Sequence, residues 1–110
     1  MSKFMMLIRN EGDGMANLTE QERGEHMQAW GAYMGGLGEK LLDGLPFSPA
    51  GSVVTSGGVN DGKHSEGGVN VGGYLVVEAG DLQEAIELSK ACPALENKTS
   101  SIEVRECLNM

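Results

Sequence analysis

The stretch VGGYLVVE at residues 71–78 and the stretch KFMMLIR at residues 3–9 are nearly continuous apolar runs. Such runs are typical of strands that are covered on both faces. A helix start follows each of them along the chain. Residues 19–22 (TEQE) form a capping box, and residues 81–84 (DLQE) cap a second helix, which Pro93 ends. The sequence therefore predicts two buried strands, each leading to a helix.

The first helix is expected to pack on a sheet through one apolar stripe. The members of the stripe recur at steps of three and four residues: Met27, Trp30, Met34, Leu37 and Leu41. The same helix contains Gly24, Gly31, Gly35, Gly36 and Gly38. Each of these costs up to about 1 kcal/mol relative to alanine. We interpret them as positions where the helix backbone packs closely on the sheet.

Weaker patterns complete the set of elements. Residues 41–47 are predicted to form a less regular strand. Residues 102–106 (IEVRE) alternate between apolar and charged side chains, which is typical of a strand with one solvent-exposed face. Residues 48–70 are a glycine-rich loop in which residues 53–55 are a candidate short strand. The order strand, helix, strand, loop, strand, helix, strand is the split βαβ, or ferredoxin-like, pattern. It predicts an α+β fold with an antiparallel sheet.

The length predicts a single domain over residues 1–110. In the split βαβ fold the first and third strands are central, which agrees with the two apolar runs. Two helices cover only one face of such a sheet, so the other face is expected to expose apolar side chains. A homodimer that packs sheet against sheet would cover them.

The charge balance excludes one class of partner. The chain has 16 acidic and 8 basic side chains, a formal net charge of −8, and scattered basic residues. Nucleic-acid binding needs clustered lysine and arginine against the phosphates, so we expect no nucleic-acid partner. No apolar run reaches the roughly 18 residues of a membrane span, so we expect no membrane partner.

The cysteines and the N-terminus bear on the compartment. The N-terminal apolar stretch ends without a small-residue cleavage site, so we expect no signal peptide. Cys92 and Cys107 are then expected to be buried thiols in a cytoplasmic protein. A P-loop-like spacing at residues 57–64 has His64 where serine or threonine must bind magnesium. No metal or other cofactor site is predicted.

His26 is one of two side chains that titrate near neutral pH. It lies four residues after Glu22 and four before Trp30, and Tyr33 follows on the same helix. One hypothesis makes His26, Trp30 and Tyr33 a wall of a ligand-binding cleft, with Glu22 orienting the imidazole. The alternative is a half-exposed histidine on the solvated flank of the helix.

His64 is the other such side chain, in the polar sequence DGKHSE at residues 61–66. Asp61 and Glu66 are candidates to orient this imidazole for acid–base catalysis, and Lys63 is a candidate to bind a substrate carboxylate. The alternative is a hydrated turn tip, because Asp-Gly is a strong turn signal. Loops of this length in small domains are usually functional or disordered, so both interpretations stay open.

Several motifs carry a family resemblance: WGAYMG at residues 30–35, residues 61–74, VVEA at 76–79, CP at 92–93 and IEVR at 102–105. With them the chain resembles the YCII-related (DGPF-motif) domain family over nearly its whole length. The family signature is D-G-P-F-x-E followed by G-G-Y. Asp61, Gly62, Glu66, Gly72, Gly73 and Tyr74 stand at its positions, while Lys63 and His64 replace the Pro and the Phe.

The resemblance implies a ferredoxin-like protomer that dimerises into an α/β barrel with clefts between helix and sheet. Some relatives are similar to lyases or dehydrochlorinases that use a His–Asp pair. Their His lies early in the first helix, and their Asp directly precedes a proline after the second helix. Here His26 lies near the first position, but Cys92 precedes Pro93. The resemblance also implies a genomic association of some members with alternative sigma factors, which points to a regulatory role.

Two functions are therefore predicted as alternatives. The first is a small-molecule-binding homodimer, including a lyase- or isomerase-like activity on a small polar metabolite. Its catalytic candidates are His64, Asp61 and Glu66, and its ligand-binding candidates are His26, Trp30, Tyr33 and Lys63. The second function is a non-catalytic regulatory or protein-interaction module, which the missing acid before Pro93 favours.

Overall fold

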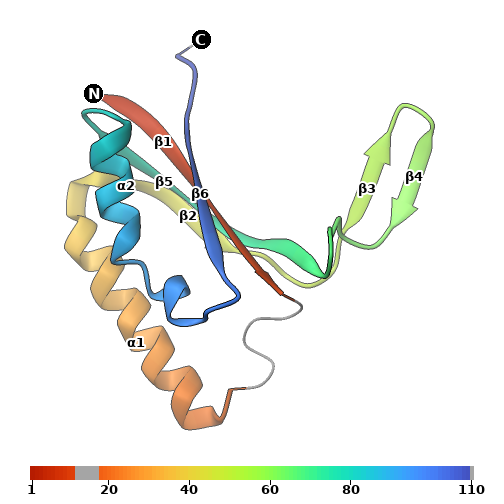
Figure 1. The fold of residues 1–110 in the computed structure, drawn as a ribbon, viewed down its shortest axis with the longest axis horizontal. Coiled ribbons are helices and arrows are strands. Elements are labelled where there is room, and N and C mark those ends of the chain that lie inside the picture. Colours follow the sequence, from red (N-terminus) through yellow and green to blue (C-terminus); the bar gives the residue numbers. More distant parts are fainter. Residues whose placement is uncertain (12–17, 110) are drawn as a thin grey trace.

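The fold is built on a four-stranded antiparallel sheet. The computed structural model describes residues 1–11 and 18–109. The elements are β1 (Ser2–Glu11), α1 (Glu20–Leu37), the 3₁₀ turn η1 (Gly38–Lys40), β2 (Leu41–Pro46), β3 (Ser52–Thr55), β4 (Gly58–Asp61), β5 (Val69–Ala79), α2 (Leu82–Lys90), the 3₁₀ turn η2 (Pro93–Glu96) and β6 (Ser101–Glu106). The main sheet has the strand order β2-β5-β1-β6 (Figure 1). This order confirms the predicted split βαβ, ferredoxin-like α+β fold.

The central strands β1 and β5 carry the hydrophobic core. Their buried side chains alternate along each strand: Phe4, Met6 and Ile8 in β1, and Leu75, Val77 and Ala79 in β5. Most of them pack with Leu37 of α1 and Ala85 of α2 in one cluster. Both helices therefore cover the same face of the sheet.

The other face of the sheet is apolar and open in the protomer. Met5 and Leu7 of β1 and Tyr74 and Val76 of β5 alternate with the core residues and are only partly buried. Figure 1 shows α1 and α2 on the same side of the sheet. The open apolar face predicted from the two-sided strands is present.

The capping box of α1 is confirmed, but the predicted apolar stripe is too long. Thr19 Oγ1 accepts a hydrogen bond from the Glu22 amide at 3.1 Å, and Glu22 Oε1 accepts one from the Thr19 amide at 3.1 Å. The helix ends at Leu37, and Gly38 adopts a φ of 56° that favours glycine. Leu41 therefore begins β2 and is not part of the helix.

The glycines of α1 do not pack on the sheet, which corrects the sequence interpretation. A Cβ built at Gly24, Gly31, Gly35 or Gly36 would meet no atom within 4 Å. These residues lie on the exposed side of the helix, away from the core. Their only intrinsic effect in the protomer is the entropic cost of glycine in a helix.

Gly31→Ala is therefore expected to stabilise the protein by about 0.5–1 kcal/mol. Gly73→Ala is the matched control, because its Cβ would lie 3.1 Å from Leu45 O and 3.2 Å from Pro46 Cα across the β2–β5 pair. That variant is expected to be destabilised. Urea unfolding of both variants measures the two changes. A destabilised Gly31→Ala variant would contradict the open environment of this helix face.

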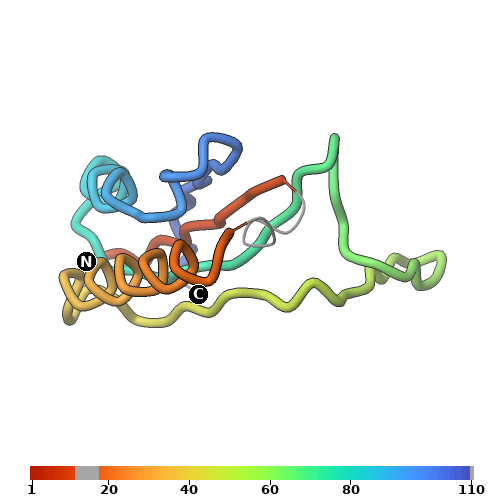
Figure 2. The backbone as a smooth tube through the Cα atoms, turned by 90° about the horizontal axis from the view of Figure 1, so that it is seen from below, coloured from red at the N-terminus to blue at the C-terminus, as the bar shows by residue number. Residues whose placement is uncertain are grey.

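Residues 48–70 contain a β-hairpin that projects away from the helices and the main sheet (Figures 1 and 2). β3 and β4 pair with each other as a separate two-stranded sheet, with Val54 opposite Val59. The short strand predicted at residues 53–55 is confirmed as part of β3, whereas β4 was not predicted. We call residues 52–61 the arm.

Candidate functional site

A cleft of about 1050 Å³ lies between α1 and the sheet. Its walls come from α1, the end of β2, the start of β5 and residues 94–100. Gly44, Gly72 and Gly73 line the sheet side. A Cβ at each of these positions would lie within 3.1 Å of an atom of a neighbouring strand, so glycine lets the strands that form this wall approach one another closely.

His26 lies in the helical wall of this cleft, and its side chain is 19% exposed. Its Nε2 accepts a hydrogen bond of 2.9 Å from the indole Nε1–H of Trp30. The two rings are T-shaped, with an interplanar angle of 82°. Because Nε2 accepts, we assign the proton of the neutral imidazole to Nδ1.

The Nδ1 of His26 faces a carboxylate from another part of the chain. Glu96 Oε2 lies 3.7 Å from it, an ion-pair distance. Glu96 is the last residue of η2, which Pro93 begins shortly after α2. A carboxylate beside this nitrogen helps to orient the ring. His26 is thus held between an N–H donor and an acidic side chain.

The carboxylate beside the His26 ring belongs to Glu96 and not to Glu22, which was expected from the sequence to orient this ring. Glu22 also lines the cleft, but its carboxylate accepts the Thr19 amide in the capping box. The hydrogen bonds from the Thr19 backbone and side chain lower the pKa of Glu22. The only sequence signal for Glu96 is an acid three residues after the proline that ends α2. Its contact with α1 depends on how η2 packs, which the pattern does not reveal.

Tyr33 lies behind the cleft and not in its wall. Its hydroxyl donates a hydrogen bond of 2.7 Å to the carbonyl of Leu88 in α2. Its ring packs against the core and makes a T-shaped contact with Trp30 at a centroid distance of 6.0 Å. Burial and, to a smaller extent, the Cys92 thiolate raise the pKa of Tyr33 to about 12. The structure therefore brings His26 and Trp30 together but gives Tyr33 a place in the core.

The raised pKa of Tyr33 predicts a loss of stability in alkali. The phenol ionises near pH 10 in the unfolded chain but only near 12 in the folded one. The stabilisation from the neutral folded phenol is therefore present below pH 10 and is lost as the pH rises to about 12. Urea unfolding at several alkaline pH values should show a smaller loss for Tyr33→Phe than for the wild type. Equal losses would contradict this assignment.

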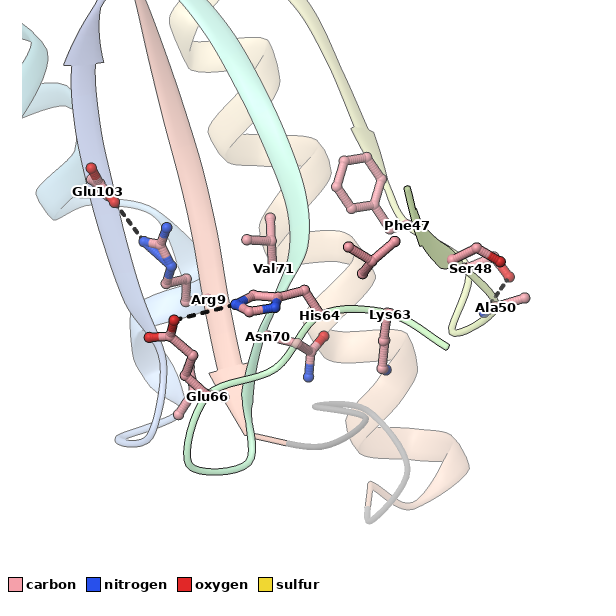
Figure 3. Close-up of a pocket in the computed structure, with 14 residues that line it drawn as sticks. Arg9, Phe47, Ser48, Ala50, Lys63, His64, Glu66, Asn70, Val71 and Glu103 are labelled. Atoms are coloured by element: carbon pink, nitrogen blue, oxygen red, sulfur yellow. Dashed lines mark hydrogen bonds and ion pairs between the residues drawn. The ribbon is translucent and has the colours of Figure 1, made fainter. Parts of the chain in front are cut away.

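A second cavity, of about 650 Å³, lies on the open face of the sheet (Figure 3). Arg9 of β1 and Glu103 of β6 form an ion pair of 2.6 Å in its wall. The residues that line both this cavity and the cleft are Phe47, Ser48, Lys63, Asn70 and Val71. The cleft and the second cavity therefore adjoin each other at the base of the arm.

The fold separates Asp61 from the other polar residues around His64. His64 Nε2 lies 3.3 Å from Glu66 Oε1, and both side chains line the second cavity while being 70% and 85% exposed. Asp61 ends β4 opposite Ser52 and lines neither hollow. Lys63 lines both hollows and forms no ion pair with any described residue. Glu66 is thus the acidic neighbour of His64, and Asp61 is not.

Cys92 occupies the position directly before Pro93. Its side chain is buried, and burial raises the pKa of its thiol. A buried thiol of this kind is mostly protonated at neutral pH and is a poor nucleophile. Cys92 is therefore a small core residue, as predicted, and Cys107 is partly buried.

Residues 2–110 match the YCII-related domain, which is nearly the whole chain. The chain belongs to the YCII-related domain family. None of the curated proteins matches it by sequence. Among solved structures it is similar to 5-chloro-2-hydroxyhydroquinone dehydrochlorinase (TftG) from Burkholderia phenoliruptrix AC1100 in complex with 2,5-dihydroxybenzoquinone. The TM-score is 0.61 and the identity 19%, over 98% of this chain and 95% of that chain. At this identity the likeness supports the fold.

In this YCII-related domain the signature residues Gly72, Gly73 and Tyr74 all line the cleft. The close approach of β2 favours glycine at position 73, because a Cβ there would make tight contacts with the β2 backbone. Gly72 lies at the register shift between β1 and β5, and its carbonyl accepts a hydrogen bond from the Phe47 amide. The G-G-Y signature therefore shapes the sheet side of the cleft. No helix in the described part of the chain is long and apolar enough to cross a membrane.

Proposed function

We propose that this protein is a homodimer that binds a small polar molecule in the cleft and moves a proton on it, as a lyase or isomerase does. The observation that carries the proposal is the placement of His26 between Trp30 and Glu96 in the cleft wall. Small-molecule sites are concave and combine apolar walls with a few convergent polar groups. A histidine beside an orienting carboxylate is the arrangement that general acid–base catalysis uses.

His26 Nε2 is the basic atom in this proposal. A bound molecule with an acidic C–H next to a carbonyl displaces the indole N–H of Trp30 and presents that C–H to Nε2. The C–H bond breaks, the proton joins Nε2, and the electron pair stays on the substrate as an enolate. Glu96 then stabilises the imidazolium. Return of the proton at another atom gives an isomer, whereas loss of a leaving group from the neighbouring carbon gives a lyase product.

The charges around the cleft support a polar ligand. Lys63 and Lys98 line the cleft without an ion pair in the described residues, and Glu25 lies on the α1 side. We assign Lys63 and Trp30 to ligand binding, because both line the cleft and both can donate hydrogen bonds.

The open face of the sheet supports the homodimer. Met5, Leu7 and Val76 form an apolar surface that neither helix covers, and such surfaces mark interaction sites. A second copy packed sheet against sheet would remove it from water. The free thiols of Cys92 and Cys107 fit the cytoplasmic location expected from the sequence.

A thermal-shift screen of small polar carbonyl compounds tests the proposed binding. The first compound is 2,5-dihydroxybenzoquinone, which the structural neighbour binds. A ligand at about 100 times its Kd stabilises the folded state by about 2.7 kcal/mol. In a domain of this size that raises the Tm by about 10 °C. No shift with any compound of the panel would count against a small-molecule site.

His64 and Glu66 form a second candidate acid–base pair, which their 3.3 Å contact favours. His64→Ala is expected to keep the thermal shift if the ligand binds beside His26. Loss of the shift in His64→Ala, with the shift retained in His26→Gln, would move the site to the second cavity. A protein-interaction role is favoured by a different observation, the exposed apolar side chains of Val54 and Val59 on the arm.

A further inference from the structure

The second cavity is built from residues of a single protomer. Strands β1, β5 and β6 form its floor, and residues 47–53 and 63–66 form its walls (Figure 3). A hydrogen bond of 2.9 Å from Gly62 N to Gly51 O joins the two walls. The cavity therefore does not depend on the proposed homodimer.

A tight turn fixes the wall that contains His64. Glu66 and Val69 exchange two backbone hydrogen bonds, of 2.9 and 3.0 Å. Gly67 and Gly68 between them have φ values of 60° and 81°, and a two-residue type I′ turn requires a positive φ at both positions. The chain thus turns back directly before β5, and the side chains of His64 and Glu66 line the cavity.

An irregularity in the sheet lies at the floor of the cavity. Ile8 of β1 pairs with Gly73 of β5, but Arg9 pairs with Val71, so Gly72 is an extra residue in β5. Cross-strand partners share one face of a sheet, and Arg9 and Val71 both line the cavity. Bulges of this kind re-aim side chains and are over-represented beside functional sites. Here the bulge places an apolar side chain next to a guanidinium.

The charge around the cavity differs from that of the whole chain. Glu103 is shared between two guanidiniums: its Oε1 lies 2.6 Å from Arg9 and its Oε2 lies 3.3 Å from Arg105. Lys63 lines the cavity and forms no ion pair with a described residue. These three basic side chains accompany two acidic ones, Glu103 and Glu66, whereas the chain has 8 basic and 16 acidic side chains. The cavity therefore favours an anion.

The polar groups of the cavity are suited to a carboxylate. A guanidinium carries five N–H donors in a planar fork that matches a carboxylate. Arg9 contacts Glu103 through Nη1, and no described residue accepts a hydrogen bond from its Nε or Nη2. The ammonium of Lys63 adds further donors, and the imidazole of His64 donates an N–H in either protonation state. Arg9 thus has donors left for a second carboxylate.

The remaining lining is apolar, which distinguishes an organic acid from a bare phosphate ion. The apolar side chains that line the cavity are Phe47, Ala50, Val53, Val69 and Val71. They gain free energy only by contact with a hydrocarbon part, which inorganic phosphate does not have. The volume of about 650 Å³ lies in the range of small-molecule sites.

We propose that the second cavity is a binding site for a small organic carboxylate with an apolar body. Arg9 binds the acid group, Lys63 adds positive charge, and the apolar side chains around Val71 contact the hydrocarbon part. This site is separate from the reaction centre proposed beside His26, and the inference does not rest on that centre.

A nuclear magnetic resonance titration with benzoate tests this inference. The chain has two histidines, His26 in the cleft and His64 in the second cavity, so their ring C–H signals report on the two places separately. Benzoate is expected to move the His64 signals and to leave those of His26 and the indole of Trp30 in place. Benzamide has the same shape without the charge and is expected to move neither. Inorganic phosphate is expected to bind at least about tenfold more weakly than benzoate.

Arg9→Gln is expected to raise the benzoate Kd, measured at the His64 signals, about tenfold or more. Arg105→Gln is the matched control, because it removes the same charge from the same partner, Glu103, but does not line the cavity. Its Kd is expected to stay within about twofold of the wild type, as for an exposed ion pair. Arg9→Lys keeps the charge and loses the fork, so its Kd is expected to lie between those of Arg9→Gln and the wild type.

Each other outcome contradicts a definite part of the inference. His64 signals that stay in place with benzoate overturn the site, and movement of the His26 signals instead places the carboxylate in the cleft. Equal weakening by Arg105→Gln assigns the effect to net charge and overturns the role of Arg9. Equal binding of benzamide or of phosphate overturns the ligand class. None of these results bears on the reaction proposed at His26, which is tested with carbonyl compounds.

Discussion

His26→Gln is expected to lower turnover of a substrate bound in the cleft by about 10²–10⁴-fold, the usual contribution of a general base. Glutamine can still accept the hydrogen bond of Trp30, and it has a similar length, but it cannot take a proton at neutral pH. Its effect therefore isolates proton transfer from packing. The measurement is the steady-state rate of the variant with the compound that the thermal-shift screen identifies.

Two further variants make this result specific to the His26–Glu96 pair. Glu96→Gln keeps the shape of the side chain but removes the charge opposite Nδ1, so its rate is expected to fall less than that of His26→Gln. His64→Ala is expected to keep its rate, because His64 lies in the second cavity. Full activity in His26→Gln together with loss of activity in His64→Ala would assign the chemistry to His64 and Glu66.

Phe4→Ala is expected to lower the free energy of unfolding by about 3–5 kcal/mol. Phe4 is completely buried in the central strand β1 and packs in the cluster that joins the sheet to both helices. Its removal leaves a cavity between elements that cannot easily close it. Since domains are stable by only about 5–15 kcal/mol, much of the total is lost. Denaturant unfolding, followed by the fluorescence of Trp30, measures the change.

Phe47→Ala is the matched control, with the same chemical change at a side chain that is 52% exposed. Phe47 contacts Tyr74 at the end of β2 but does not belong to the core. Its replacement is expected to cost less than half as much as that of Phe4. Equal losses at the two positions would contradict the placement of the core on the helix side of β1.

The fold was predictable because its signals are local. The apolar runs in β1 and β5 indicate central strands, and in the structure both strands have a neighbour along each edge. The capping box at Thr19 marks the helix start, because its two hydrogen bonds join residues three apart. The helix end was predicted too late, because the spacing from Leu37 to Leu41 continues the helical period across Gly38. Only the backbone conformation of Gly38 ends it.

The candidate site was predictable only in part, because its contacts join distant segments. His26 and Trp30 lie one turn apart on a helix, so their contact follows from helical geometry. The contact of His26 with Glu96 needs η2 to pack against α1, and no periodicity reports that. Asp61 is close to His64 in sequence, but pairing of β4 with β3 directs it toward Ser52. Sequence proximity therefore did not distinguish Glu66 from Asp61 as the neighbour of His64, and it contained no signal for the contact of His26 with Glu96.

The indole N–H resonance of Trp30 tests the central claim most directly, because the chain contains a single tryptophan. This N–H donates to His26 Nε2 in the cleft. A proton–nitrogen correlation spectrum, recorded while 2,5-dihydroxybenzoquinone or another compound that raises the Tm is added, follows this one group. We predict that the indole resonance moves in step with binding, because the ligand displaces the bond to His26. An indole resonance that stays in place while the compound saturates the protein would contradict a ligand site beside His26.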